Sequence, residues 1–229
     1  YGRPNLANVM IPDSVISIGD DAFYGCYSLT NVTIGNGVTN IGGDAFGFCN
    51  NLKNVTIPDS VIGIGGYAFD DCDHLANVTI GNGVTSIGNG VFYSCNNLTN
   101  VTIGNHVITI GDDAFFNCGM TSVVIPASVT NLGYALDDCY NLTTVNVDPA
   151  NLFYSSVDGV LFDKNQTTLI LYPIGRTANH YSVPNGVTRI ENGAFYQCLG
   201  LTSVTIPETL QLRLYELRRI LGKALSQRA

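Results

Sequence analysis

The sequence predicts an α/β protein: a right-handed solenoid with 23-residue coils, a parallel β-sheet on one face, short helical turns on the other, and a C-terminal helix. Two observations predict this fold. The first five of the seven cysteines, from Cys26 to Cys118, follow one another at intervals of 23 residues. A pattern of about eight positions recurs in register with them. Periods of roughly 20 to 29 residues with a short β segment are typical of solenoids.

Each repeat is expected to begin with a β-strand. In Val55-Thr56-Ile57 apolar residues alternate with a polar one, which turns Val55 and Ile57 toward the core and Thr56 toward solvent. A single copy cannot bury its apolar side alone, so the copies must stack. The copies start at Val9, Val32, Val55, Val78, Val101, Val123, Val145 and Tyr181.

The rest of each repeat is expected to return the chain to the next strand. Pro58-Asp59-Ser60, or its counterpart Gly35-Asn36-Gly37, forms a turn because Pro fixes φ and Gly reaches positive φ at little cost. Val61 and Ile64 then supply a second apolar pair. The stretch from Ala68 to Cys72 predicts a short helical or 3₁₀ turn that closes the coil.

One coil, residues 145–180, departs from this pattern. It is longer than the others and lacks both the Ala-Phe pair and the cysteine. Two segments, residues 158–164 and 168–173, are expected to be short strands. This arrangement predicts a β-hairpin with its turn at Asp163 to Gln166.

The repeat I-P-x-x-V-x-x-I-G-x-x-A-F-x-x-C-x-x-L resembles the BspA-like (Treponema-type) leucine-rich repeat. Residues 9–144 and 181–207 match it, and the irregular coil is similar to one found in that family. The resemblance implies a leucine-rich-repeat solenoid over residues 1–207. It also implies a surface-exposed or secreted microbial protein that mediates adhesion. The partner would be a protein or glycan of a host matrix, a host cell or another microbe.

Residues 208–229 differ from the array in composition and charge. They hold five of the ten basic residues, for a local charge of +3 against −11 for the rest. A stripe of leucines at helical spacing predicts one helix. The stripe is Leu210, Leu214, Leu217, Leu221 and Leu225. We expect this helix to cap the last coil; a partner-binding helix, a membrane-surface helix and a segment foreign to the array are the alternatives.

The cysteines are expected to be buried free thiols that act as small apolar residues. Neighbouring coils hold equivalent side chains about 4.8 Å apart and parallel, whereas a disulfide needs Cβ atoms about 3.8 Å apart and converging. The count of seven is odd, and the close C-x₂₋₄-C pairs of zinc sites are absent. The sequence therefore predicts neither a disulfide ladder nor a metal site.

Charge and composition exclude several classes of function. A formal charge of −8 over 229 residues argues against nucleic-acid binding. No apolar run reaches the roughly 18 residues that indicate a membrane span. Aspartates gather beside the Ala-Phe turn, where we expect a solvated face, with weak divalent-cation binding as the alternative. The chain opens on Tyr1 rather than Met, so we expect it to be a piece of a longer protein.

No catalytic residue and no cofactor are predicted. His74, His106 and His180 occupy non-equivalent places, and none has a nucleophile or carboxylate at motif spacing. The motifs G-x-S-x-G, H-E-x-x-H and the P-loop are absent. The expected function is therefore non-catalytic binding.

Side chains that point outward from the strands form the predicted ligand-binding face. They are short, hydrogen-bonding and, apart from one lysine, uncharged. The set is Asn31, Thr33, Lys53, Asn54, Thr56, Asn77, Thr79, Asn100, Thr102, Ser122, Thr144 and Asn146. These positions are alternatively no more than soluble residues suited to a strand. Aromatic residues around the Ala-Phe-x-x-Cys turn form a rival surface, and Phe153, Tyr154 and Tyr172 of the irregular coil are further candidates.

Two other functions fit the same array. A structural spacer would hold another domain away from a cell surface and would bind no ligand itself. An intracellular protein-interaction scaffold would use the same sheet for a different partner. The sequence does not choose an oligomeric state or a ligand.

Overall fold

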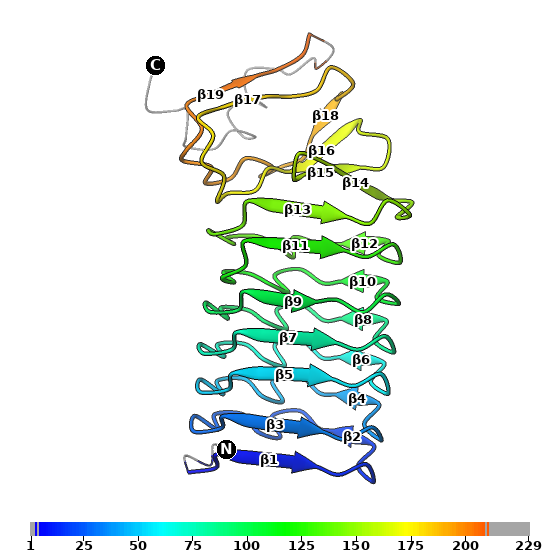
Figure 1. Ribbon diagram of the computed structural model, residues 1–229, viewed down its shortest axis with the longest axis vertical. Coiled ribbons are helices and arrows are strands. Elements are labelled where there is room, and N and C mark those ends of the chain that lie inside the picture. Colours follow the sequence, from blue (N-terminus) through cyan, green and yellow to red (C-terminus); the bar gives the residue numbers. More distant parts are fainter. Residues whose placement is uncertain (1–2, 4, 209, 211–229) are drawn as a thin grey trace. The chain divides into compact units, whose positions relative to one another are not determined.

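The computed structural model describes residue 3, residues 5–208 and residue 210. The chain divides into two units: unit 1 is Tyr1–Met120 with Ser128–Cys139, and unit 2 is Thr121–Ala127 with Tyr140–Ala229. The described residues form strands and turns and contain no helix. Unit 1 is a β-solenoid whose coils of about 23 residues rise in the right-handed sense (Figure 1).

The first sheet of unit 1 is the stack predicted from the Val-Thr-Ile segments. Val9 pairs with Val32, and Val55 pairs with Val78, so successive coils are offset by one 23-residue repeat. Val55 and Ile57 are buried. Across this parallel sheet the strands are β1 (Asn8–Ile11), β3 (Asn31–Ile34), β5 (Asn54–Ile57), β7 (Asn77–Ile80) and β9 (Asn100–Thr102) (Figure 1).

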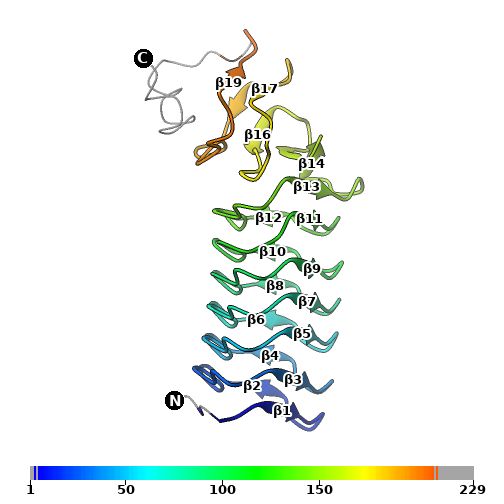
Figure 2. The ribbon, with the colours of Figure 1, turned by 60° about the vertical axis from the view of Figure 1, so that its left-hand side comes forward.

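The second member of each repeat's second apolar pair, Ile64 and its equivalents, lies in a second parallel sheet, which the sequence did not predict. Ile41 pairs with Ile64 and Ile64 with Ile87, and all three are buried. Figure 2 shows this sheet as a separate column of strands beside the first. Its strands are β2 (Ser17–Ile18), β4 (Asn40–Ile41), β6 (Gly63–Ile64), β8 (Ser86–Ile87), β10 (Thr109–Ile110) and β12 (Asn131–Leu132).

The segment that closes each coil is a run of turns, so the predicted short helix is wrong. Tyr67 N donates to Asn89 O at 2.9 Å and Phe69 N to Val91 O at 2.8 Å, both in the next coil. A helix would instead use carbonyls four residues earlier in the same chain segment. Tyr67 and Asp71 have φ of 58° and 48°, which interrupts the right-handed backbone that a helix requires. The described chain is therefore all-β rather than α/β.

The positive φ recurs at two places in the repeat, five residues and one residue before the cysteine. Asp, Asn and Gly tolerate this left-handed conformation better than other residues. Several aspartates beside the Ala-Phe turn occupy these places, so the backbone itself favours them. They are Asp21, Asp44, Asp71, Asp113 and Asp138.

The core of unit 1 is a column of stacked phenylalanines flanked by cysteines. Five rings stack with centroids 5.1 to 5.5 Å apart and interplanar angles of 6° to 14°. They belong to Phe23, Phe46, Phe69, Phe92 and Phe115. The cysteines are free and buried, which confirms the prediction. From Cys49 to Cys139 the Sγ atoms donate to phenylalanine carbonyls of the preceding coil, for example Cys95 Sγ to Phe69 O at 3.1 Å.

Thiol labelling tests this burial. Cys49, Cys72 and Cys95 are 0% exposed, and burial raises the pKa of Cys72 and Cys95 above the ordinary thiol value. Both effects withhold the reactive thiolate. We expect Ellman's reagent to modify these thiols at least ~1,000-fold more slowly in the native chain than in denaturant, because reaction requires opening of the coil. Rapid labelling of the native chain at these three positions would contradict the packing.

Unit 2 begins with the parallel pair β11 (Ser122–Ile125) and β13 (Thr144–Val147). The predicted hairpin is confirmed: β15 (Val160–Asp163) and β16 (Thr168–Leu171) are antiparallel. A further strand, β14 (Tyr154–Val157), pairs with the other edge of β15 and was not predicted. The remaining strands are β17 (His180–Ser182), β18 (Arg189–Ile190) and β19 (Ser203–Thr205).

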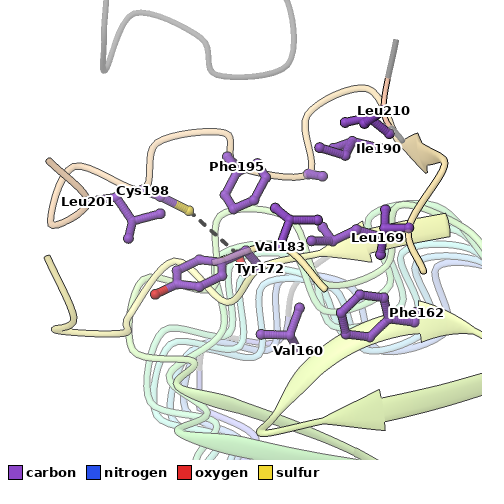
Figure 3. Packing of buried hydrophobic residues seen from close by; sticks show 12 residues of the cluster. Val160, Phe162, Leu169, Tyr172, Val183, Ile190, Phe195, Cys198, Leu201 and Leu210 are labelled. Carbon is purple, nitrogen blue, oxygen red and sulfur yellow. Dashed lines mark hydrogen bonds between the residues drawn. The ribbon is translucent and has the colours of Figure 1, made fainter. Parts of the chain in front are cut away.

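A separate apolar cluster holds unit 2 together (Figure 3). Phe162, Tyr172 and Phe195 are each at most 1% exposed within it. Cys198 Sγ donates to Tyr172 O at 3.5 Å. Leu210 is buried against the same cluster. The rest of the predicted C-terminal helix lies outside the described residues, and the boundary at residue 207 stays a prediction.

Candidate functional site

The outer face of the first sheet carries nine of the predicted ligand-binding residues. All nine are exposed; eight lie on strands, where alternation requires it, and Lys53 immediately precedes β5. They are Asn31, Thr33, Lys53, Asn54, Thr56, Asn77, Thr79, Asn100 and Thr102. We call this surface the strand face.

An asparagine ladder runs along the strand face. Asn31 Nδ2 donates to Asn8 Oδ1 at 2.9 Å, Asn77 Nδ2 to Asn54 Oδ1 at 2.6 Å, and Asn100 Nδ2 to Asn77 Oδ1 at 2.8 Å. Sequence reasoning did not predict the ladder, although asparagine recurs at the same repeat position. The ladder fixes the amide orientations and leaves further donor and acceptor capacity for a ligand. A pre-ordered side chain loses less conformational entropy on binding.

The other three predicted residues belong to unit 2. Ser122 and Asn146 are exposed on β11 and β13. Thr144 is half-buried, because the turn between β14 and β15 packs on it at Gly159. Val145 N donates to Gly159 O at 2.9 Å. Thr144 is therefore a weaker candidate for ligand contact than the sequence predicts.

A small polar cluster surrounds His180 on β17. Its Nδ1 lies 2.8 Å from Ser203 Oγ, and its Nε2 lies 3.0 Å from Ser182 Oγ. No described hydrogen bond joins His180 to a carboxylate that could fix its tautomer and stabilise an imidazolium. The cluster supplies hydrogen-bonding groups for recognition but not the charge arrangement of a nucleophilic triad.

The turn side of unit 1 carries aromatic rings. Tyr67 is 42% exposed and lies 6.1 Å, centroid to centroid, from Tyr93, which stacks on Phe116 at 4.6 Å. In unit 2, Phe153 is half exposed, but Tyr172 is a core residue at 1% exposure. The prediction that Tyr172 contacts a ligand is therefore wrong, because its ring packs against Tyr181 and Phe195.

Asp70 is a buried carboxyl in one of these turn segments. It is 8% exposed, and its Oδ1 has no hydrogen-bond partner. Burial raises its pKa to about 7, with further contributions from the charges of Asp71 and Asp44. Asp137 has its pKa raised to about 6 by burial and by neighbouring aspartates. These carboxyls therefore titrate closer to neutrality than surface aspartates do.

Asp70→Asn should stabilise the protein near pH 8 by about 1–2 kcal/mol, because it removes a buried charge while keeping the side-chain shape. Since the folded pKa of Asp70 lies above the unfolded value, the wild-type chain loses stability as pH rises from about 4 through about 7. The variant should show a flatter profile of urea midpoint against pH. Asp59→Asn is the control, since Asp59 lies at a different turn. Equal pH slopes for Asp70→Asn and the wild-type chain would contradict the assignment.

Within the part of the chain that the structure describes, no group of three His, Cys, Asp or Glu side chains could hold a metal ion. Over the same residues, a search for helices with the length and hydropathy of a membrane span finds none.

Comparisons with known proteins agree with the coil geometry. A family model described as BspA type Leucine rich repeat region matches residues 1–103 and 175–214 in six copies. A leucine rich cell surface protein from Faecalibacterium prausnitzii is 32% identical, with a TM-score of 0.65, over 90% of this chain and 69% of that one. A leucine-rich repeat protein from Eubacterium ventriosum is 27% identical, with a TM-score of 0.74, over 89% of this chain and 54% of that one. The comparison with curated proteins found no match.

The family model covers more than half of the chain and matches it where the 23-residue repeats are regular. It leaves out residues 104–174, which include the irregular hairpin coil. No catalytic family is indicated. The chain belongs to the BspA-type leucine-rich repeat family.

Proposed function

We propose that this chain is a non-catalytic binding module of a surface-exposed or secreted microbial protein, which mediates adhesion through the strand face. The partner would be a protein or glycan on a host or microbial surface. Family membership supports a binding role, and the similar Faecalibacterium protein is described as a cell surface protein. The observation that carries the proposal is the ordered asparagine ladder on an exposed sheet.

The strand face suits the recognition of an extended polar ligand. Asparagine and threonine columns run across β3, β5, β7 and β9, and Lys53 is the one charged residue among the nine predicted there. Successive coils repeat the same donors and acceptors about every 4.8 Å. A ligand that crosses several coils would therefore meet the same hydrogen-bonding groups repeatedly, so that weak single contacts add up.

Binding to immobilised matrix proteins and glycans tests the proposal. We expect the chain to bind at least one, and Thr33→Glu with Thr79→Glu to weaken that binding about tenfold by placing charge on the strand face. The matched control is Asn40→Glu with Ser86→Glu, two exposed positions equally far apart on the second sheet. A spacer would bind nothing in this screen, and equal loss in both variants would exclude the strand face.

A further inference from the structure

The turn side of unit 1 forms a second surface, which we call the turn face. It consists of the segments between the second sheet and each cysteine, where the chain makes successive turns. It is distinct from the strand face, because the two occupy different parts of every repeat. Its segments are residues 20–25, 43–48, 66–71, 89–94 and 112–117.

Unit 1 is strongly acidic, and most of its charge lies at the turn side. It contains twelve aspartates and no glutamate against Arg3 and Lys53, for a formal charge of −10. All but Asp13 and Asp59 lie beside the Ala-Phe turn in sequence. Burial and the charges of neighbouring aspartates raise the pKa of both Asp44 and Asp113, as expected for carboxylates without a compensating cation.

Aromatic rings lie among these carboxylates. Tyr67, Tyr93 and Phe116 form a connected row over three coils. Tyr24 lies close enough to Asp70, Asp44 and Asp21 for their charges, together with burial, to raise its pKa. Ring faces and carboxylates both attract cations. A positively charged side chain is therefore the chemistry that both features favour.

Asp70 provides an independent indication of a missing partner. It is 8% exposed. Its Oδ1 and the edge of the Tyr24 ring both lie where a side chain on Gly47 would point. The oxygen accepts no hydrogen bond. Asp44, Asp71, Tyr24, Cys72 and Cys95 are the described titratable groups that couple to it electrostatically, and none of them is a cation. An unpaired carboxyl at this depth is costly, and a cation bound nearby would offset part of that cost.

We propose that the turn face of unit 1 binds a cationic polypeptide segment, whose Arg and Lys side chains lie against the row Tyr67, Tyr93 and Phe116 and pair with the aspartates beside it. The face repeats about every 4.8 Å over several coils, and an extended chain presents side chains on one side about every 6.7 Å, so several cations engage together. A bound metal ion fits less well, since among the residues that the structure describes no three His, Cys, Asp or Glu side chains are placed to hold one. The surface is separate from the strand face, so the two proposals stand or fall independently.

The test uses the full chain and an acetylated, amidated peptide in which Arg alternates with Ser over twelve residues. We expect saturable binding at low salt by isothermal titration calorimetry, weakened as salt rises. The same peptide with citrulline in place of Arg should not bind, because citrulline keeps the shape and loses the charge. Absence of binding by the Arg peptide at low salt, or equal binding of the citrulline peptide, would overturn the proposal.

Two charge-matched variants locate the site. Asp71→Asn with Asp113→Asn removes two charges beside the ring row, and Asn tolerates the φ of 48° and 57° at these positions. Asp13→Asn with Asp59→Asn removes two charges from the other turn. There Asp13 Oδ1 and Asp59 Oδ1 each accept a hydrogen bond from a backbone N–H of the next coil. Asn82 Oδ1 accepts the equivalent bond from Asn105 N, so Asn suits this position. We expect about tenfold weaker peptide binding in the first variant and less than about twofold in the second. Equal weakening of peptide binding in the two variants would mean that the peptide is attracted by net charge alone, and would overturn the proposed site.

Tyr93→Leu tests the aromatic contribution. Leu keeps an apolar side chain of similar bulk but has no ring face, so peptide binding should weaken about threefold while its salt dependence is unchanged. An unchanged melting temperature shows that the coil is intact. A variant that remains folded and binds as tightly as the wild-type chain would remove the rings from the site and contradict the proposal as stated.

Discussion

Phe69→Ala is expected to lower the free energy of unfolding by about 3–5 kcal/mol, the range for deleting a buried aromatic ring from a core. Phe69 is 0% exposed and lies between Phe46 at 5.1 Å and Phe92 at 5.5 Å, centroid to centroid. Its removal leaves a cavity in the middle of the column, because rigid coils above and below cannot both move to fill it. Urea unfolding followed by circular dichroism measures the loss.

Tyr67→Ala is the control for this substitution. Tyr67 lies two residues earlier in the same coil, but its ring is 42% exposed, and we expect a cost of about 1 kcal/mol. A loss below about 1 kcal/mol for Phe69→Ala would mean that the phenylalanine column does not carry the core.

Gly65→Ala is expected to cost about 3 kcal/mol, the upper end of the range for overpacking, because the obstacle is backbone. A Cβ on Gly65 would lie 2.6 Å from Gly43 N and 3.0 Å from Gly43 Cα, in the preceding coil. The methyl group fits only if the two coils separate, which would weaken bonds such as Gly65 N to Ile41 O at 2.8 Å. Thermal unfolding and urea midpoints report the change.

Gly19→Ala offers a matched control within the same chain. Gly19 occupies the same repeat position as Gly65, but a Cβ there would meet nothing within 4 Å. We expect the substitution to be neutral or to stabilise by about 0.4–1 kcal/mol through the unfolded state. If both alanine variants behaved alike, the glycine would serve backbone conformation rather than coil contact, and the stacking distance would be wrong.

The sequence predicted the first sheet, its register and the buried thiols because each depends on one period. Val55 and Val78 pair since the repeat returns the same apolar residue to the same place, and Cys72 is buried for the same reason. The hairpin of β15 and β16 could also be predicted from the sequence, because Asp163–Gln166 separates two apolar stretches.

The turn segments were mispredicted because local spacing could not show where their N–H groups donate. Ala68, Phe69 and Cys72 have spacing that fits one helical turn, but Phe69 N donates to the next coil. The sequence predicted that the aspartates among these turns form a solvated face. In the structure Asp44 and Asp71 also adopt the left-handed backbone conformation of the turns. From the sequence alone, an aspartate that the backbone conformation requires looks the same as an aspartate that is merely exposed to solvent. The geometry of the coil is needed to tell them apart.

On the strand face, too, one feature could be predicted from the sequence and another could not. Exposure of Asn54 and Thr56 followed from alternation alone, but the bond between Asn77 Nδ2 and Asn54 Oδ1 required the stacked coils. The burial of Asp70 likewise depends on neighbouring coils, since its Oδ1 lies against Gly47, 23 residues earlier.

The sequence by itself determined that identical 23-residue units stack in register and which side chains of each strand face inward, because periodicity and alternation are properties of the chain. Only the tertiary structure decided the second sheet, the left-handed turns, the asparagine ladder and the unpaired carboxyl of Asp70. The second sheet and the ladder arise between coils, where the bonding partner is a backbone or side-chain atom one full repeat away, and the burial of Asp70 depends on the neighbouring coil.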